Sequence, residues 1–393
     1  MYSVFYTIVL VGLWVVNVFN GTAMGETYRT AEIATVVTLV VAVCCLAVQS
    51  VREGDLEIAP KYFYTVGALI VVTLINLYVK GYSLLDIRAY WGFLVVFILS
   101  KMRPNKTAVR MTAVCYGVLG LFFLYVYGYT DVLKGWNSNS IAMVGLFSFL
   151  VFCIPFYGMR EWRSFVMMPL VGAIYVVMIL PTDSRSCILM IIIELLLVLR
   201  IIPIRKTLSK SKGIIVFLQI PLIIAVFVVL VSIFGNMAGL MQWSYETFNK
   251  PLFNGRDEIW LEGFKRLRSV PLFGTGDMGV SYWHNCAISA LTSTGIVGYV
   301  LWNRLLYLIL KEGRHYLHDT VVIGAMTSFF VLYAQQSVEL GLFAISPNII
   351  PYIILGIVLG RVGYLKEYDE AEKERRLPER RSEHHGHHHH SGV

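Results

Sequence analysis

Apolar runs of about 20 residues recur along the whole chain, and this feature constrains the fold more than any other. An α-helix needs a run of that length to cross the hydrocarbon core of a membrane. The composition agrees, because 57% of the residues are hydrophobic and only 15% are charged, against about 25% in a soluble domain. The sequence therefore excludes an ordinary soluble enzyme and a disordered chain, and it predicts an all-α polytopic membrane protein.

The apolar runs predict about 12 transmembrane helices joined mostly by short loops. We expect these spans at 2–19, 31–50, 62–79, 88–100, 111–129, 140–158, 165–180, 186–202, 214–234, 285–310, 320–340 and 347–364. No Lys or Arg precedes the first span, so we interpret it as a retained anchor and not as a cleaved signal peptide. Residues 1–364 then form one transmembrane domain. Residues 365–393 form a charged cytoplasmic tail whose His-rich end is typical of a purification tag.

The distribution of Lys and Arg predicts which way the helices are oriented. If the N-terminus is cytoplasmic, the five inner loops contain fifteen Lys and Arg residues, whereas the five short outer loops contain five. Inner loops of membrane proteins carry the excess of positive charge. We therefore expect both termini in the cytoplasm.

One outer loop, 235–284 between the ninth and tenth spans, is much longer than the others and contains five basic and five acidic residues. Within it, Asn254 is a suitable N-cap, and apolar side chains from Ile259 to Leu267 recur at helical spacing. We expect a short amphipathic helix on the outer membrane surface. A flexible turn at Gly274 and Gly276 should follow it.

His284 is the only histidine predicted on the outer side, at the junction of the long loop and the tenth span. An imidazole accepts a proton near neutral pH, so His284 is a candidate general base. A single histidine at a helix start is also common as a cap or an interface residue. The motifs around it favour the catalytic interpretation.

These ordered motifs resemble those of the bacterial O-antigen ligase and surface polysaccharide polymerase family. The resemblance covers roughly residues 183–310, and the rest of the chain agrees in span number and orientation. It is carried by Ser184-Arg185-Ser186, Gly255-Arg256, Gly274-Thr275-Gly276, and His284-Asn285 followed after nine residues by Gly295-Ile296-Val297-Gly298.

The resemblance implies a GT-C-like helical fold in the bacterial cytoplasmic membrane, with the active site facing outside. It implies inverting transfer of a glycan from an undecaprenyl-diphosphate carrier to the hydroxyl of a glycan or lipid acceptor. The enzyme would be a polysaccharide polymerase or an O-antigen ligase of cell-envelope biosynthesis. Membrane lipids, a chain-length regulator and a flippase are the implied partners, and nucleic acid is not one.

The same resemblance assigns roles to individual residues. His284 would deprotonate the acceptor, while Arg185 and Arg256 would bind the diphosphate. Guanidinium groups suit this task because their planar donors match phosphate oxygens. Further candidates are Asn285, Glu339, Arg266 and Arg268. Because the outer side contains no Asp-x-Asp triplet, we expect no metal ion and no other cofactor.

Several candidates also have structural interpretations. Arg185 could anchor a helix end to lipid headgroups, and Arg256 could pair with Asp257 or Glu258 in its own helix. Arg266 and Arg268 suit contacts with solvent or headgroups. Glu339 could orient His284 or line an acceptor cavity.

Glu194, near the middle of the eighth span, favours an alternative function. A carboxylate at that depth often belongs to a transport pathway, so a secondary transporter or lipid-linked glycan flippase is the competing class. Glu194 could instead pair with Arg304 or make a hydrogen bond between helices. A scaffold protein of a larger assembly would leave the motifs unexplained.

Overall fold

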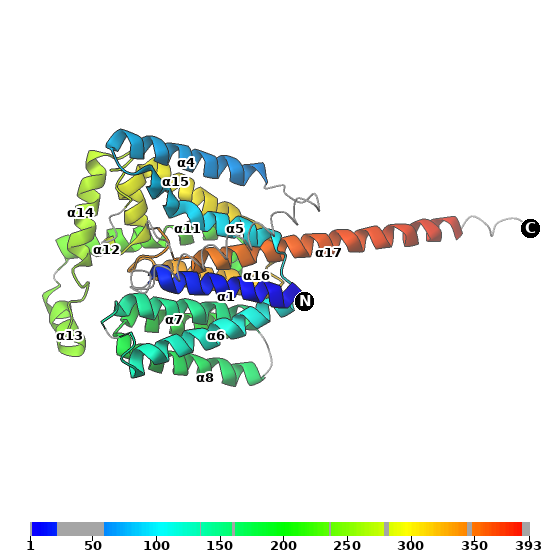
Figure 1. Ribbon diagram of the computed structural model, residues 1–393, viewed down its shortest axis with the longest axis horizontal. Coiled ribbons are helices and arrows are strands. Elements are labelled where there is room, and N and C mark those ends of the chain that lie inside the picture. The colour runs from blue at the N-terminus through cyan, green and yellow to red at the C-terminus, as the bar shows by residue number, and fades with distance from the viewer. Residues whose placement is uncertain are drawn as a thin grey trace, which may run out of the picture.

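The computed structural model describes residues 2–21, 59–133, 135–158, 162–235, 237–278, 283–343 and 348–386. Within these residues the regular secondary structure is helical, with no β-strand. Figure 1 shows most of the long helices running along one axis, while α14 (Arg256–Ser269) lies across one end of the bundle. The all-α class predicted from the sequence is therefore confirmed for the described residues.

Helices occupy eleven of the twelve ranges predicted as spans, and the second range, 31–50, lies outside the described residues. The α-helices at the predicted spans are α1 (Tyr2–Gly21), α4 (Pro60–Lys80), α5 (Trp91–Lys101), α6 (Lys106–Tyr129), α7 (Ser138–Cys153), α8 (Trp162–Ile179), α9 (Arg185–Val198), α11 (Ser211–Leu218), α12 (Ile220–Phe234), α15 (Cys286–Gly313), α16 (Thr320–Gln335) and α17 (Ile350–Gly386). The remaining elements besides α14 are η1 (Leu84–Tyr90), η2 (Ile154–Phe156), η3 (Leu180–Thr182), α10 (Arg205–Leu208), α13 (Ala238–Phe248) and η5 (Arg314–Tyr316).

Five helical units of the described residues are long and apolar enough to cross a membrane: α4, α6, α7 with η2, α8 with η3, and α15 with η5. The bent pair α11 and α12 would make a sixth if it is one span, and α1 and α16 are apolar but shorter. These helices indicate a membrane-embedded protein. The total of 12 spans stays a prediction.

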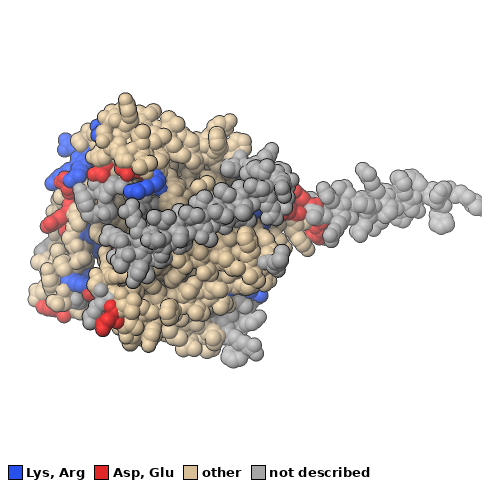
Figure 2. All heavy atoms as spheres, in the orientation of Figure 1, with Lys and Arg blue, Asp and Glu red and all other residues tan. Residues whose placement is uncertain are grey.

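Charged side chains are concentrated toward the ends of the bundle. On the face seen in Figure 2, most of the Lys, Arg, Asp and Glu drawn lie toward the two ends of the long axis. The N-terminal end of α1 and the C-terminal part of α17 lie at one end, and α13 and α14 lie at the other (Figure 1). α17 remains helical to Gly386, far beyond the span predicted to end at residue 364, because its continuation is rich in Glu, Lys and Arg, which favour helix.

The ninth predicted span is broken in the structure. α11 and α12 meet at Gln219 with a bend of 48°. The cause lies in Pro221, which has no N–H to donate and whose ring clashes with the preceding turn. Two tyrosine side chains form hydrogen bonds with residues at the break. The Tyr299 hydroxyl donates to Gln219 Oε1 (2.9 Å), and the Tyr333 hydroxyl donates to the Leu218 carbonyl (3.0 Å).

The tenth span is also interrupted, because Gly295 within α15 has φ 66° and ψ −171°. The chain segment after α14 binds to the interrupted turn. The Ile296 N–H donates to the Pro271 carbonyl (2.9 Å), and the Thr275 N–H donates to the Thr292 carbonyl (2.8 Å). The turn predicted to be flexible is thus fixed by backbone hydrogen bonds to α15.

We predict that Gly295→Ala destabilises the protein. A Cβ there would collide with the backbone of Leu272 and Phe273, and its φ and ψ are open almost only to glycine. The cost should be on the order of 1–3 kcal/mol, and the thermal unfolding midpoint in detergent should fall accordingly.

The matched control is Gly239→Ala in α13, where nothing lies within 4 Å of the added Cβ. That substitution should leave the midpoint unchanged or raise it, since alanine favours helix. Equal midpoints for wild type and Gly295→Ala would contradict the prediction.

A buried ion pair joins the start of α16 to α17 at the end of the bundle where the termini lie. Asp319 caps α16 by accepting from the N–H groups of Val321 and Val322, and it accepts from Arg361 Nη2 of α17 at 2.8 Å. Both charged side chains are 4% exposed. Burial alone would raise the pKa of the Asp319 carboxyl, but hydrogen bonds and charge from Arg361 outweigh it and hold that pKa below its ordinary value.

Asp319→Leu should therefore be strongly destabilising, by about 3–5 kcal/mol, because it leaves the Arg361 charge buried without its partner. Thermal unfolding of the purified protein measures this. The double variant Asp319→Leu with Arg361→Met should recover part of the loss. A single variant as stable as the wild type would disprove the role given to this pair.

Candidate active site

Asn285 joins three elements at the start of α15. Its Oδ1 accepts from the N–H groups of Ala287 and Ile288, which caps the helix. Its Nδ2 donates to the carbonyls of Pro221 (2.8 Å) and Ser337 (2.9 Å). The side chain is fully buried and already committed to these contacts. Asn285 therefore fixes the position of its neighbour His284 and does not itself face a ligand.

The segment after α16 brings Glu339 next to the start of α15. Besides the bond from Asn285 to Ser337, the Cys286 N–H donates to the Gln336 carbonyl at 3.0 Å. Gln336 Oε1 in turn accepts from the N–H of Leu342 (2.8 Å), which holds the chain in a tight loop. These bonds determine where the carboxylate of Glu339 lies.

Glu339 contacts two of the residues singled out in the sequence. Its Oε1 accepts a hydrogen bond from Arg256 Nη2 at 2.7 Å, and its Oε2 lies 3.3 Å from His284 Nδ1. The side chains of Glu339, Arg256 and His284 are 6%, 19% and 39% exposed. A buried carboxylate thus lies between a guanidinium and a partly exposed imidazole, and we call these three residues the Glu339 cluster.

Arg256 reaches this cluster because of how α14 begins. Gly255, in a left-handed conformation (φ 76°), is the N-cap residue, one position after the predicted Asn254. Asp257 accepts from the Ser232 hydroxyl of α12 (2.7 Å), which holds the first turn of α14 against that helix. The alternative considered for Arg256, an ion pair within its own helix, is not the one found, since its ion pair is with Glu339.

The turn before His284 is anchored by two tryptophans. The Trp260 Nε1–H donates to the carbonyl of Trp283 at 2.6 Å, and both rings are almost fully buried. His284 has φ 46°, an uncommon backbone conformation for a residue other than glycine. Such conformations persist where the surroundings enforce them. Here the Trp283 contact on one side and the buried Asn285 on the other supply that constraint.

Arg185, the first residue of α9, lies near the same end of the molecule. Lys250, in the connection between α13 and α14, forms an ion pair with Asp183 just before α9. Cys187 in the first turn of α9 is close enough to Glu339 to interact with it electrostatically. The structure thus brings the start of α9, with Arg185 as its first residue, close to the Glu339 cluster.

Arg266 and Arg268 lie roughly 15 Å or more from Arg256 along the axis of α14. Arg266 pairs with Glu262 (3.2 Å) and lies over the ring of Trp283 (5.4 Å). Arg268 is exposed. Exposure fits the solvent contact considered for Arg268, whereas Arg266 is engaged with protein partners instead.

Glu194 forms a hydrogen bond between helices. It is fully buried in α9 and accepts from the Ser328 hydroxyl of α16 at 2.7 Å. Arg304, the other partner considered from the sequence, is exposed on α15. The interhelical alternative therefore describes Glu194 in this structure.

Sequence reasoning missed the polar loop that builds the site. Gln335, Gln336 and Ser337 are buried polar residues at the C-terminal end of the apolar helix α16 and directly after it. Three polar residues in succession at the end of a predicted span would have been the available signal, because buried polar groups need fixed partners.

Within the described residues, no group of three or more His, Cys, Asp or Glu side chains is arranged to hold a metal ion. Comparison of the chain with protein-family models gives no match, and comparison with curated proteins gives none either.

Proposed function

We propose that the protein is a membrane glycosyltransferase that acts on the outer side of the cytoplasmic membrane of a bacterium. In this proposal it transfers an undecaprenyl-diphosphate-linked glycan to an acceptor hydroxyl with inversion, without a metal ion, as a polysaccharide polymerase or an O-antigen ligase. The finer architecture proposed with it is a 12-span, GT-C-like bundle with cytoplasmic termini. The observation that carries the proposal is the Glu339 cluster, which joins a base to an anion-binding group.

The contact between Glu339 and His284 suits general base catalysis. When His284 Nδ1 carries a proton and donates it to Glu339 Oε2, Nε2 has a free lone pair to accept the proton of an acceptor hydroxyl. The carboxylate also stabilises the imidazolium that forms, as in other catalytic His–carboxylate pairs. The partial exposure of His284 gives an acceptor a route to it.

Arg256 is suited to bind the diphosphate leaving group. Of its guanidinium donors, Nη2 binds Glu339, and among the described residues the buried Nε has no hydrogen-bond partner. An unpaired buried donor is costly, so an anionic ligand that accepts from it would bind favourably. Diphosphate oxygens have the geometry and charge for this role.

The transfer step forms one bond to the anomeric carbon of the donor sugar and breaks another. The acceptor oxygen attacks the anomeric carbon on the face opposite the diphosphate, and the bond from that carbon to the diphosphate oxygen breaks. The acceptor proton passes to His284 Nε2. The diphosphate leaves on its lipid with the bonding electron pair, and Arg256 stabilises the charge that develops, with Arg185 as the proposed second cation.

An apolar groove of about 470 Å³ provides a surface for the lipid part of the donor. It lies between α4 and the chain after α14, and its lining includes Val72, Ile75, Leu272 and Phe273. The groove is at the far end of α14 from Arg256, roughly 20 Å along the helix. A long isoprenoid chain spans that distance.

A transporter or lipid-linked glycan flippase is the second candidate, and the two interrupted helices favour it. Transporters often build their binding sites from discontinuous helices. In this chain, however, the breaks at Gln219 and Gly295 are hydrogen-bonded to neighbouring residues. Reconstituted vesicles would separate the two functions, because a flippase moves the labelled donor across the bilayer without changing its size.

The proposal is tested by incubating the purified protein with a defined undecaprenyl-diphosphate oligosaccharide and sizing the products. Extension of the donor alone indicates a polymerase, and transfer only after a lipid or glycan acceptor is added indicates a ligase. Activity should persist in excess chelator. Absence of any transfer with matched donor and acceptor would refute the proposal.

His284→Gln should lower the transfer rate by about 10²–10⁴, because it removes the general base while it keeps a polar side chain of similar size. The rate is measured with saturating donor in the assay above. His318→Gln, an exposed histidine after α15, is the matched control and should retain the wild-type rate. Wild-type turnover in His284→Gln would rule out its role as the base.

Arg256→Lys should lower the rate at least about tenfold, although the charge is conserved, because lysine lacks the planar set of donors. Arg268→Lys, on the same helix but exposed, should have no effect. A full rate in Arg256→Lys would mean that charge alone suffices and that the geometry of the guanidinium does not matter.

A further inference from the structure

Glu194 is a fully buried acid in α9 that the proposed transfer step does not involve. It lies roughly 14 Å along the helix axis from Arg185, the first residue of α9. At its level α9 packs against neighbouring helices, among them α7, α8 and α16. A role for Glu194 is therefore independent of the proposed function.

Glu194 differs from the other acids that are buried in the described part of the chain. Asp319 forms an ion pair with Arg361, and Glu339 forms one with Arg256. Glu194 has no ion pair with a described residue, and its Oε2 has no hydrogen-bond partner among them. The two paired acids can stay ionised because a cation compensates their charge, whereas Glu194 lacks that compensation.

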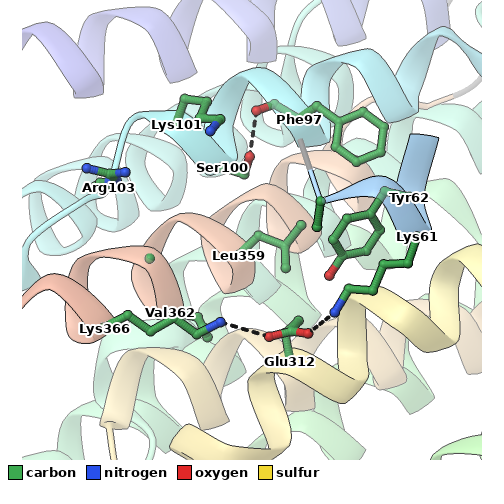
Figure 3. Close-up of a pocket in the computed structure, with 12 residues that line it drawn as sticks. Lys61, Tyr62, Phe97, Ser100, Lys101, Arg103, Glu312, Leu359, Val362 and Lys366 are labelled. Atoms are coloured by element: carbon green, nitrogen blue, oxygen red, sulfur yellow. Dashed lines mark hydrogen bonds and ion pairs between the residues drawn. The ribbon is translucent and has the colours of Figure 1, made fainter. Parts of the chain in front are cut away.

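A partly buried acid near the end of α15 shows the same contrast. Glu312 lies in a hollow of about 210 Å³, between Lys61 of α4 and Lys366 of α17 (Figure 3). Its Oε2 is 3.0 Å from Lys366 Nζ. Two ammonium groups thus stabilise the ionised form of Glu312, and this residue provides a matched comparison for Glu194.

The one hydrogen-bond partner of Glu194 among the described residues is the hydroxyl of Ser328 in α16. Ser328 Oγ lies 2.7 Å from Glu194 Oε1 and 3.0 Å from the carbonyl oxygen of Leu150 in α7. A carboxylate and a carbonyl both need a hydrogen from the hydroxyl, because neither has one to give. The hydroxyl has a single hydrogen, so it cannot satisfy both oxygens when Glu194 is ionised.

The Leu150 carbonyl depends on that hydrogen because it lies in the last turn of α7. In a continued helix it would accept from the N–H of Ile154, but that N–H donates to the Val151 carbonyl. Leu150 is fully buried, and a buried carbonyl without a donor is costly. We therefore assign the Ser328 hydrogen to Leu150.

The titratable groups near Glu194 do not compensate a negative charge either. The Cys153 thiol of α7 and the Tyr157 hydroxyl after η2 are close enough to interact with it electrostatically. A thiol and a phenol are uncharged in their protonated forms, so neither neutralises a carboxylate. A carboxyl group with an unpaired charge in an apolar interior binds a proton instead.

We propose that Glu194 is a proton-binding site, at which Oε1 holds a proton at neutral pH and donates it to Ser328 Oγ. Protonation reverses the direction of that hydrogen bond and leaves the Ser328 hydrogen for the Leu150 carbonyl. The resulting chain of hydrogen bonds joins α9 to α16 and α7. A sodium ion held by the same oxygens is the competing occupant, and the experiment distinguishes the two.

Infrared spectroscopy of the purified full chain in detergent at neutral pH tests the proposal, because a protonated carboxyl group absorbs above the amide bands and a carboxylate does not. The wild type should show this band with or without sodium chloride, and Glu194→Gln should lose it. Glu312→Gln is the matched control and should retain it. Absence of the band in the wild type, its loss on addition of sodium, or an undiminished band in Glu194→Gln would overturn the proposal.

Thermal unfolding of the same samples is the second readout. Glutamine is neutral, and its amide can donate to Ser328 Oγ as the acid does, so Glu194→Gln should keep the wild-type midpoint. A clearly raised midpoint would show that the variant had removed an unpaired charge, against the proposal. If Glu194→Gln fails to fold, Ser328→Ala replaces it, and the infrared band should move to higher frequency because the acid loses its acceptor. A band that stays in place would then contradict the assignment.

Discussion

The carboxylate of Glu339 is the contact on which the candidate active site depends. It is buried, so its charge needs partners, and it finds them in Arg256 of α14 and His284 at the start of α15. The connecting chain between these two residues crosses the end of the bundle as α14. One side chain therefore holds both ends of that crossing segment against the loop that follows α16.

The rest of this end of the molecule makes the contact possible. A helix interrupted in an apolar environment must find other partners for its backbone groups. At Gly295, the backbone of α15 forms hydrogen bonds with the chain that follows α14. At the break between α11 and α12, tyrosine hydroxyls and Asn285 form hydrogen bonds with the interrupted helix. The same hydrogen bonds that make the breaks tolerable also fix α14 and His284 relative to Glu339.

The sequence predicted the helical class and most helix positions well, since long apolar runs have few alternatives. It also selected His284, Arg256 and Glu339. It did not reveal the breaks, because a proline or glycine in an apolar run is compatible with a continuous span, and it did not reveal α13. The pairing of Arg256 was missed as well: Asp257 is near in sequence, whereas Glu339 is brought close only by folding.

The two ends of the bundle differ in how they use charge. At the end with the termini, Asp319 and Arg361 form a fully buried pair whose groups also cap a helix, an arrangement that suits stability. At the other end, Arg256 keeps a buried donor without a partner among the described residues, and His284 stays partly exposed. A buried donor without a partner needs an explanation, and the proposed anionic ligand of Arg256 supplies one.

The most direct test of the central claim is a double-mutant cycle between Glu339 and Arg256, measured by thermal unfolding of the purified protein with Glu339→Gln, Arg256→Gln and both substitutions. If the carboxylate holds α14 in place, the two effects should be coupled by about 0.5–3 kcal/mol, with the double variant less destabilised than the sum. Effects that add within about 0.3 kcal/mol would show that the two residues act independently, and would contradict the account.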